Sequence, residues 1–212
     1  MILDRITSRR HFLQVGAAAG GGMVLSLSLP IASSDAQPAA AGGFEPNAFI
    51  RIAGNGQVTM TMPYVEMGQG TYTAIPMLIA EELEVELKQV LLEHAPPNPK
   101  LYGNPVLGGE QVTGNSSAIR AAWQPLRQAG AVARTMLVAA AAKRWNVDPS
   151  SCHAQAGEVI HTATGKKLKY GELVADAAKL PVPKEVALKQ PKDFKLIGTP
   201  AKRLDTPACR SA

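Results

Sequence analysis

The sequence predicts an α+β fold in which helices pack on a small mixed sheet. Residues 49–52 and 57–62 alternate apolar and polar side chains around Gly54-Asn55-Gly56, a pattern typical of a β-hairpin. Residues 71–83 and 118–145 carry apolar or alanine-rich helical stripes. The chain has 212 residues with 46% hydrophobic content, so it is large enough for a buried core of one domain or slightly more.

The remaining elements follow in order. Residues 90–94 are expected as a third strand, and residues 154–161 and 167–169 as short strands. Residues 170–179 are expected as a short helix, after which the proline- and lysine-rich stretch 181–212 predicts an extended connector.

The helix at 71–83 has its own start and end signals. Thr71 is a candidate cap, and Pro76 lies near the first turn, where a missing N–H has little cost. Four glutamates near its end are expected as a solvated acidic rim: Glu81, Glu82, Glu84 and Glu86.

The N-terminus has the pattern of a twin-arginine signal. Ser8-Arg9-Arg10-His11-Phe12-Leu13-Gln14 precedes an apolar, glycine-rich stretch at 15–29, and Ser34-Asp35-Ala36 supplies the small residues of a cleavage site. We expect cleavage after Ala36 and export to the periplasm by the twin-arginine translocase, which carries folded and often cofactor-loaded proteins. An uncleaved membrane anchor is the alternative, so membrane association stays open.

These signals divide the chain into a signal peptide (1–36), a flexible spacer (37–47), a folded domain (48–180) and the connector (181–212). The net charge of +5 is dispersed and not arranged as a basic stripe, which argues against nucleic acid as a partner. The two cysteines and the histidines show no metal-ligand spacing.

The first candidate site lies where the strand at 57–62 gives way to the helix at 71–83. Gly68 and Gly70 flank Gln69 there. Glycine allows close approach of a ligand to the backbone, and a helix start presents free N–H groups. Gln69 offers both a donor and an acceptor to a polar ring or a phosphate. A tight turn before an ordinary capped helix is the alternative.

A second glycine and hydroxyl cluster opens the long helix. Gly114 precedes Asn115, Ser116 and Ser117, and one of these residues can cap the helix or bind a phosphate or ring edge through its amide or hydroxyl. Taken alone, the cluster is also compatible with an ordinary N-cap.

Together the two clusters resemble a known family. Glu66-Met67-Gly68-Gln69-Gly70, followed by Thr73, resembles the E-M-G-Q-G-x-x-T motif of the molybdopterin-binding large subunits in the xanthine dehydrogenase/aldehyde oxidase family, of the isoquinoline 1-oxidoreductase beta subunit type. Thr113-Gly114-Asn115-Ser116-Ser117 resembles its second cofactor loop, and residues 197–207 resemble its connector. The resemblance covers about residues 48–207 and implies that residues 48–180 form part of the family's molybdopterin-binding domain.

The resemblance implies molybdopterin cytosine dinucleotide as the cofactor and molybdenum-dependent oxidation of an N-heterocycle or aldehyde, with water as oxygen source. Electrons would leave through a small [2Fe-2S] subunit and then a cytochrome c. By carry-over, Gln69 would hydrogen-bond an oxo ligand of molybdenum or the pterin, and Gly68 and Gly70 would admit the cofactor. Gly114, Ser116 and Ser117 would hold pterin or phosphate oxygens.

The chain departs from the family in one respect. The family's general base is a glutamate in a G-x-G-E motif, which this chain lacks, so we expect no catalytic residue and no direct metal ligand in it. The connector ends in Cys209-Arg210-Ser211-Ala212, which suggests a frameshifted or truncated end and a chain that is inactive alone. The alternatives are a non-catalytic exported binding or assembly module and a membrane-anchored domain.

Overall fold

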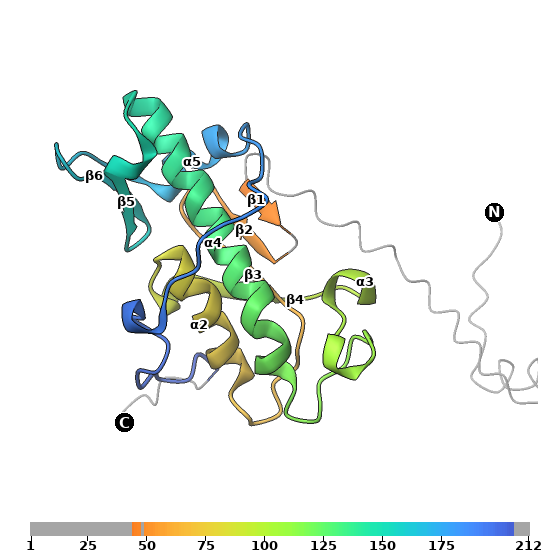
Figure 1. Cartoon of the computed structure of the whole chain (residues 1–212). Helices are drawn as coiled ribbons and strands as arrows, with labels where there is room; N and C mark the ends of the chain where they lie inside the picture. The colour runs from red at the N-terminus through yellow and green to blue at the C-terminus, as the bar shows by residue number, and fades with distance from the viewer. Residues whose placement is uncertain (1–43, 48, 206–212) are drawn as a thin grey trace, which may run out of the picture. The chain divides into compact units, whose positions relative to one another are not determined.

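The computed structural model describes residues 44–47 and 49–205 (Figure 1). The twin-arginine pattern with Arg9 and Arg10, the predicted cleavage after Ala36 and the C-terminal residues 206–212 lie outside the described residues.

The principal sheet has the strand order β1-β2-β3-β4. Strands β1 (Phe44–Asn47), β2 (Ile50–Ile52) and β3 (Val58–Met62) pair antiparallel, whereas β4 (Val90–His94) lies parallel to β3. Because β3 and β4 run parallel, the chain must cross over between them, and helix α2 (Thr71–Leu83) forms this crossover. The predicted α+β class with a small mixed sheet is confirmed.

Strand β1 corrects the predicted spacer. Residues 44–47 were expected at the end of a flexible spacer covering 37–47, but they form an edge strand. Phe44 pairs with Ile52 and Asn47 with Ile50, and the register shifts between these two pairs. The free edge of β2 offers these residues backbone partners that the local sequence does not reveal.

The long helix α4 (Ala118–Trp145) runs across the domain and packs against α2 and against β1 and β2 (Figure 1). Gly130 makes the α2 contact close, since a Cβ at this position would lie 2.8 Å from the carbonyl oxygen of Ile79. Fully buried side chains from the sheet and both helices form the core, including Ile50, Ile52, Met60, Met62, Ile75, Ile79, Leu83, Leu126 and Leu137.

A second sheet lies beyond the end of α4. It is antiparallel, with the order β5 (Cys152–Gln155), β6 (Glu158–His161) and β7 (Lys167–Lys169), and helix α5 (Tyr170–Ala177) follows it. The shorter elements are α3 (Pro99–Tyr102) and the 3-10 turns Leu87–Gln89, Pro105–Leu107, Pro149–Ser151 and Pro191–Asp193. Among the described helices, none combines the length and the apolar character needed to cross a membrane.

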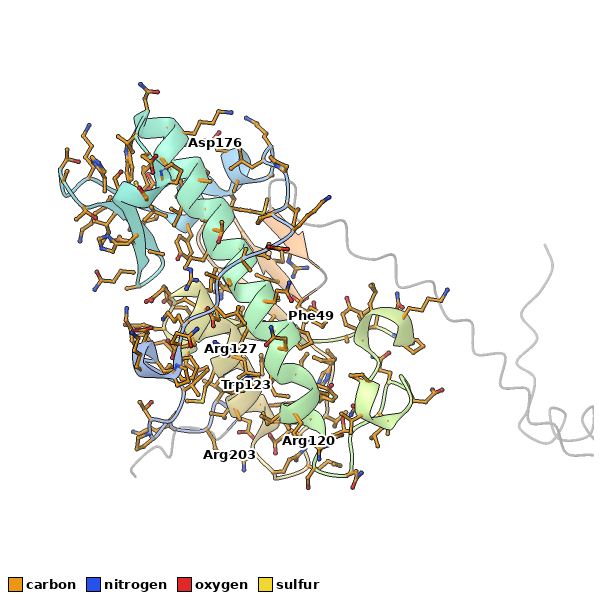
Figure 2. All side chains as sticks on the ribbon, viewed as in Figure 1. Phe49, Arg120, Trp123, Arg127, Asp176 and Arg203 are labelled. Carbon is orange, nitrogen blue, oxygen red and sulfur yellow. The ribbon has the colours of Figure 1, made fainter. Side chains whose placement is uncertain are left out.

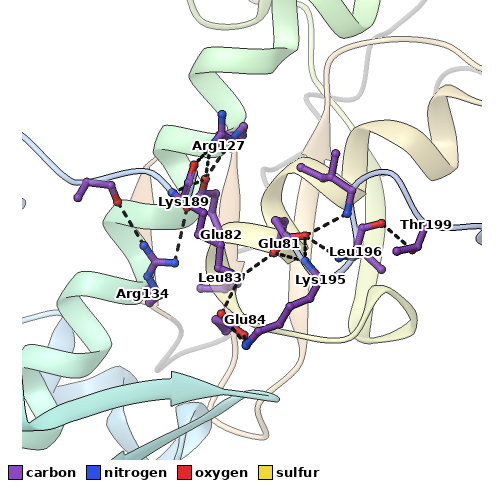
Figure 3. Close-up of polar contacts among 12 residues, drawn as sticks. Glu81, Glu82, Leu83, Glu84, Arg127, Arg134, Lys189, Lys195, Leu196 and Thr199 are labelled. Atoms are coloured by element: carbon purple, nitrogen blue, oxygen red, sulfur yellow. Dashed lines mark hydrogen bonds and ion pairs between the residues drawn. The ribbon is translucent and has the colours of Figure 1, made fainter. Parts of the chain in front are cut away.

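The acidic end of α2 is not the solvated rim that we expected. The Glu81 and Glu82 side chains are both fully buried. Glu82 accepts two hydrogen bonds from Arg127 on α4, at 2.7 and 2.9 Å (Figure 3). Burial raises the pKa of Glu81, but hydrogen bonds from Lys189 and backbone amides outweigh this effect and leave its pKa below the ordinary value. Of the predicted rim, only Glu86 is exposed, and Glu84 is half-buried.

Candidate functional site

The first glycine cluster forms a loop at the carboxyl end of β3, directly before α2. Its conformation is held by Glu66, whose Oε1 accepts hydrogen bonds from the amides of Gly68 and Gly70 at 2.7 and 2.9 Å. The other oxygen accepts from the Tyr72 amide at 2.9 Å and from the Thr71 hydroxyl at 3.3 Å. Glu66 therefore caps α2 from outside the helix, and Thr71 does not act as the cap.

Glu66 is a site residue to which sequence reasoning gave no role of its own. Hydrogen bonds from the backbone amides of Tyr72 and Gly70 lower its pKa to about 2, with a further contribution from the positive charge of Arg203. The signal for this role was available in the sequence, because a carboxylate just ahead of a helix start is well placed to accept from its free amides.

The two glycines of this loop are required by backbone conformation. Gly68 and Gly70 have φ angles of 102° and 89°, a region that L-residues with a side chain rarely adopt. Among the described residues, a Cβ at either position would meet no atom within 4 Å apart from its chain neighbours. Backbone conformation, and not crowding, is therefore the structural reason for glycine at both positions.

The Gln69 side chain is exposed and closes its own loop. Its Oε1 accepts from the Met67 amide, and its Nε2 donates to the Val65 carbonyl at 2.8 Å. An amide side chain has a further N–H and a further lone pair, so Gln69 retains one donor and one acceptor for a ligand.

The second cluster forms the loop before α4. Asn115 and Ser116 both have positive φ angles, 52° and 49°, which are unusual for non-glycine residues. Ser117 is fully buried, and its hydroxyl donates to the Gly114 carbonyl and accepts from the Asn104 side chain, both at 2.7 Å. Ser117 thus fixes the loop, and Asn104, which sequence reasoning missed, supports it from 13 residues away.

The start of α4 lacks the ordinary cap that was the alternative prediction. Its N-cap residue is Ser117, which makes no side-chain capping bond. The amides of the first helical turn have no partner within a helix. Figure 2 shows Arg120 of this turn and Arg203 at the end of the domain where α2 and α4 begin.

The two loops meet at one cleft. The amide of Val65 donates to the hydroxyl of Thr113 at 2.9 Å and ties one loop to the other. The cleft between them has a volume of about 510 Å³ and is lined by Met67, Gln69, Thr71, Ala74, Thr113, Gly114, Asn115, Ser116, Ser117, Ala118 and Ile119. Four of the predicted site residues, Gln69, Gly114, Ser116 and Ser117, are thereby brought together, whereas Gly68 and Gly70 shape the loop without lining the cleft.

The lining has a clear chemical character. It contains backbone amides, hydroxyls and the two carboxamides of Gln69 and Asn115 together with apolar side chains, and no Asp or Glu lies among the lining residues. Across the described ranges, no three His, Cys, Asp or Glu side chains are grouped so that they could hold a metal ion. The cleft is therefore suited to a ligand with oxygen-rich or ring acceptor groups that meet helix-start amides.

The fold and this cleft define an α+β domain in which two helix starts border one polar cleft. Comparison with known protein families identifies the family to which this domain belongs. The sequence pattern of the molybdopterin cofactor-binding domain matches residues 13–208. The chain belongs to this family, and the resemblance seen in its two loops is confirmed.

Two relatives match much of the chain. The isoquinoline 1-oxidoreductase subunit beta of Brevundimonas diminuta is 39% identical over 171 residues, which are 79% of this chain and 22% of that protein. The membrane-bound aldehyde dehydrogenase (pyrroloquinoline-quinone) of Gluconacetobacter polyoxogenes is 32% identical over 212 residues, which are 95% of this chain and 26% of that protein. The chain therefore spans about a quarter of the length of these relatives.

Among solved structures, quinoline 2-oxidoreductase from Pseudomonas putida 86 is similar with a TM-score of 0.48 and 22% identity. That match covers 62% of this chain and 16% of the other.

The residues present fit a molybdopterin cofactor. The cleft volume lies within the range of about 300–1,000 Å³ that is usual for ligand pockets. A pterin needs donors and acceptors at its ring edge, and phosphates need N–H groups. Gln69 supplies its unused donor and acceptor, the exposed Ser116 supplies a hydroxyl, and the start of α4 supplies N–H groups. The lining contains no carboxylate that would repel an anion.

Proposed function

We propose that this chain is the N-terminal cofactor-binding portion of a molybdenum hydroxylase large subunit. The observation that carries the proposal is the single cleft formed by two glycine-containing loops that lie more than 40 residues apart in the sequence. A chain of this family with an uncapped helix start facing such a cleft is suited to hold one end of a molybdopterin.

Each group in the cleft has a role in this proposal. Gln69 hydrogen-bonds the pterin or an oxo group with the donor and acceptor that its loop leaves unused. Ser116 and the first amides of α4 bind pterin or phosphate oxygens. Gly114 and Ser117 shape the second loop, and Gly68 and Gly70 give the first loop its conformation. When bound, the cofactor supplies the redox centre for transfer of an oxygen atom from water to the substrate.

The finer parts of the proposal concern the complete enzyme. The names of the relatives support an N-heterocycle or an aldehyde as the substrate. We propose the cytosine dinucleotide form of the cofactor and, as partners, a small [2Fe-2S] subunit and a cytochrome c. The described residues contain no G-x-G-E glutamate, so the general base would belong to another part of the enzyme and this chain would be inactive alone.

We also propose that the chain works in the periplasm after twin-arginine export. The pattern from Ser8 to Gln14 and the small residues before Gln37 support this location. Mass spectrometry of the exported chain tests it, since a mature N-terminus other than Gln37 would contradict the predicted cleavage.

The cofactor proposal is tested by the molybdenum content of the 212-residue chain, produced in a host that makes the cofactor. Gln69→Ala and Ser116→Ala each remove hydrogen-bonding groups from the cleft, so each should lower molybdenum retention about two- to tenfold, the effect of one net hydrogen bond. Gln128→Ala and Ser150→Ala are matched controls, because both residues are exposed and lie outside the cleft lining.

Circular dichroism of all four variants checks that the fold is unchanged. Equal molybdenum content in the Gln69 and Ser116 variants and their controls would contradict the proposed site. A wild-type chain that retains no molybdenum would favour the alternative of a non-catalytic binding or assembly module.

A further inference from the structure

Residues 189–205 of the connector, here the connector segment, pass along α2 to residues 65–70, here the first cofactor loop. Buried carboxylates fix this path. At its centre, the Glu81 carboxylate accepts hydrogen bonds from the backbone amides of Lys195, Leu196 and Ile197 at 2.6–3.1 Å (Figure 3). A single buried side chain therefore sets the position of three consecutive residues.

The beginning of the connector segment is held in the same way. Glu82 accepts from the Lys189 amide at 3.2 Å, and Arg127 donates to the Lys189 carbonyl at 2.6 Å. The Arg127 guanidinium lies 5.0 Å from the ring centres of both Trp123 and Phe194, so an aromatic side chain of the connector segment packs on the same cation. These contacts fix the register of the connector segment on α2 and α4.

The end of the connector segment reaches the first cofactor loop. The Leu204 amide donates to the Thr73 hydroxyl on α2 at 3.0 Å. Arg203 donates to the Gly68 carbonyl at 3.1 Å and pairs with Glu66 at 3.1 Å. Asp205 pairs with the same guanidinium through two hydrogen bonds, at 2.6 and 3.0 Å, and thereby fixes its orientation.

Gly68 is consequently held at both of its backbone polar groups. Glu66 accepts from its N–H, and Arg203 donates to its C=O. We propose that Arg203 is a positioning residue for the cofactor loop: it keeps the Gly68 carbonyl and the Glu66 carboxylate in place, and so orients Gln69 toward the cleft. Cofactor binding by this loop rests on the proposed function, whereas the positioning of the loop by Arg203 depends only on contacts within this chain.

The physical need for such a residue follows from the loop itself. Met67, Gly68 and Gln69 are exposed, so packing does little to determine the conformation of this loop. The φ angles of Gly68 and Gly70 are positive, and the loop needs specific contacts to hold this conformation. A guanidinium presents several donors in a rigid fork, which allows Arg203 to contact a carbonyl and two carboxylates at once. A lysine has the charge but not this geometry.

The experiment measures hydrogen–deuterium exchange of the amides in residues 65–72 of the full chain without cofactor. Arg203→Ala should raise exchange in this stretch about three- to tenfold, the range expected when one charge-assisted contact that closes a local opening is lost. Exchange in α4 should stay unchanged. Arg203→Lys should restore only part of the protection. Lys202→Ala is the matched control, since Lys202 is an exposed neighbouring cation, and it should leave the loop unchanged.

Two results would overturn the proposal: loop exchange in Arg203→Ala equal to that of the wild type, or complete rescue by Arg203→Lys. Molybdenum retention, measured in parallel, separates this inference from the proposed function. Faster loop exchange in a chain that never retains molybdenum supports the positioning role and rejects the cofactor site. Retention by the wild type with unchanged loop exchange in Arg203→Ala rejects the positioning role alone.

Discussion

The buried ion pair between α2 and α4 makes the strongest stability prediction. The Glu82 side chain is fully buried and the Arg127 side chain is 8% exposed. Glu82→Ala leaves the Arg127 guanidinium without its carboxylate in the interior, and loss of one member of a buried pair costs about 3–5 kcal/mol. Arg127 keeps its bond to the Lys189 carbonyl and its two aromatic neighbours, so we expect about 3 kcal/mol, the lower end of that range.

Urea unfolding provides the assay. With an m-value of about 1–3 kcal/mol/M, a loss of about 3 kcal/mol lowers the urea midpoint by about 1–3 M at unchanged m. Glu185→Ala is the control, because Glu185 is exposed, and it should change stability by less than about 0.5 kcal/mol.

A double variant tests the reason for the loss. Glu82→Met with Arg127→Met replaces the pair by apolar side chains of similar length. It should recover part of the stability that Glu82→Ala loses, since the Lys189 amide and Arg134 still lose their contacts with Glu82. The reasoning is refuted if Glu82→Ala behaves like the Glu185 control, or if the effects of Glu82→Met and Arg127→Met simply add, since additivity would mean that the two groups do not interact.

Two further predictions concern single positions. Gly130→Ala should destabilise the domain by about 2 kcal/mol in the same assay. Overpacking against the Ile79 carbonyl costs up to about 3 kcal/mol, and the higher helix propensity of alanine offsets about 1 kcal/mol of this. A more stable variant would mean that the two helices can move apart without cost. Glu66 has a pKa lowered from 4.5 to about 2, so its contribution to stability is complete above pH 4.5 and is lost as the pH falls toward 2. Urea midpoints between pH 5 and 2 should therefore fall less in Glu66→Gln than in the wild type, and parallel curves would contradict the assignment.

The regular elements could be predicted because their signals are local. Helices α2 and α4 and strand β4 have the predicted bounds, since apolar periodicity and flanking glycine or proline residues report on neighbouring positions. Strand β1 was missed because its partner, β2, supplies the hydrogen bonds that define it. In the second sheet, β7 has the predicted bounds and β6 ends at the predicted residue, whereas β5 begins two residues before the predicted start at Ala154.

The burial of the α2 acids could not be predicted from the local sequence. Glu82 meets Arg127 and Lys189 at separations of 45 and 107 residues, and Glu81 meets Leu196 at 115. Taken alone, a run of glutamates at a helix end is usually solvated. Only the return of the connector over α2 converts these charges into buried, fully hydrogen-bonded groups.

The candidate site could be predicted as two loops but not as a set of atoms. Glycine spacing before a helix identified both loops, and residues of both loops line one cleft in the structure. Which groups face the cleft depends on contacts that the sequence does not reveal: the Asn104 amide binds the Ser117 hydroxyl, and Gln69 bonds to its own loop.

The starts of α2 and α4 are held in different ways. Glu66 accepts from amides at the start of α2, so that helix is satisfied within the chain. At α4, the Ser117 hydroxyl binds Gly114 and Asn104 instead of capping the helix, and two strained positive φ angles at Asn115 and Ser116 precede it. Such strain persists only where the surrounding structure determines it. Asn104 and Gly114 therefore fix the start of α4 from outside the helix, as Glu66 fixes the start of α2, and the first amides of α4 have no side-chain cap.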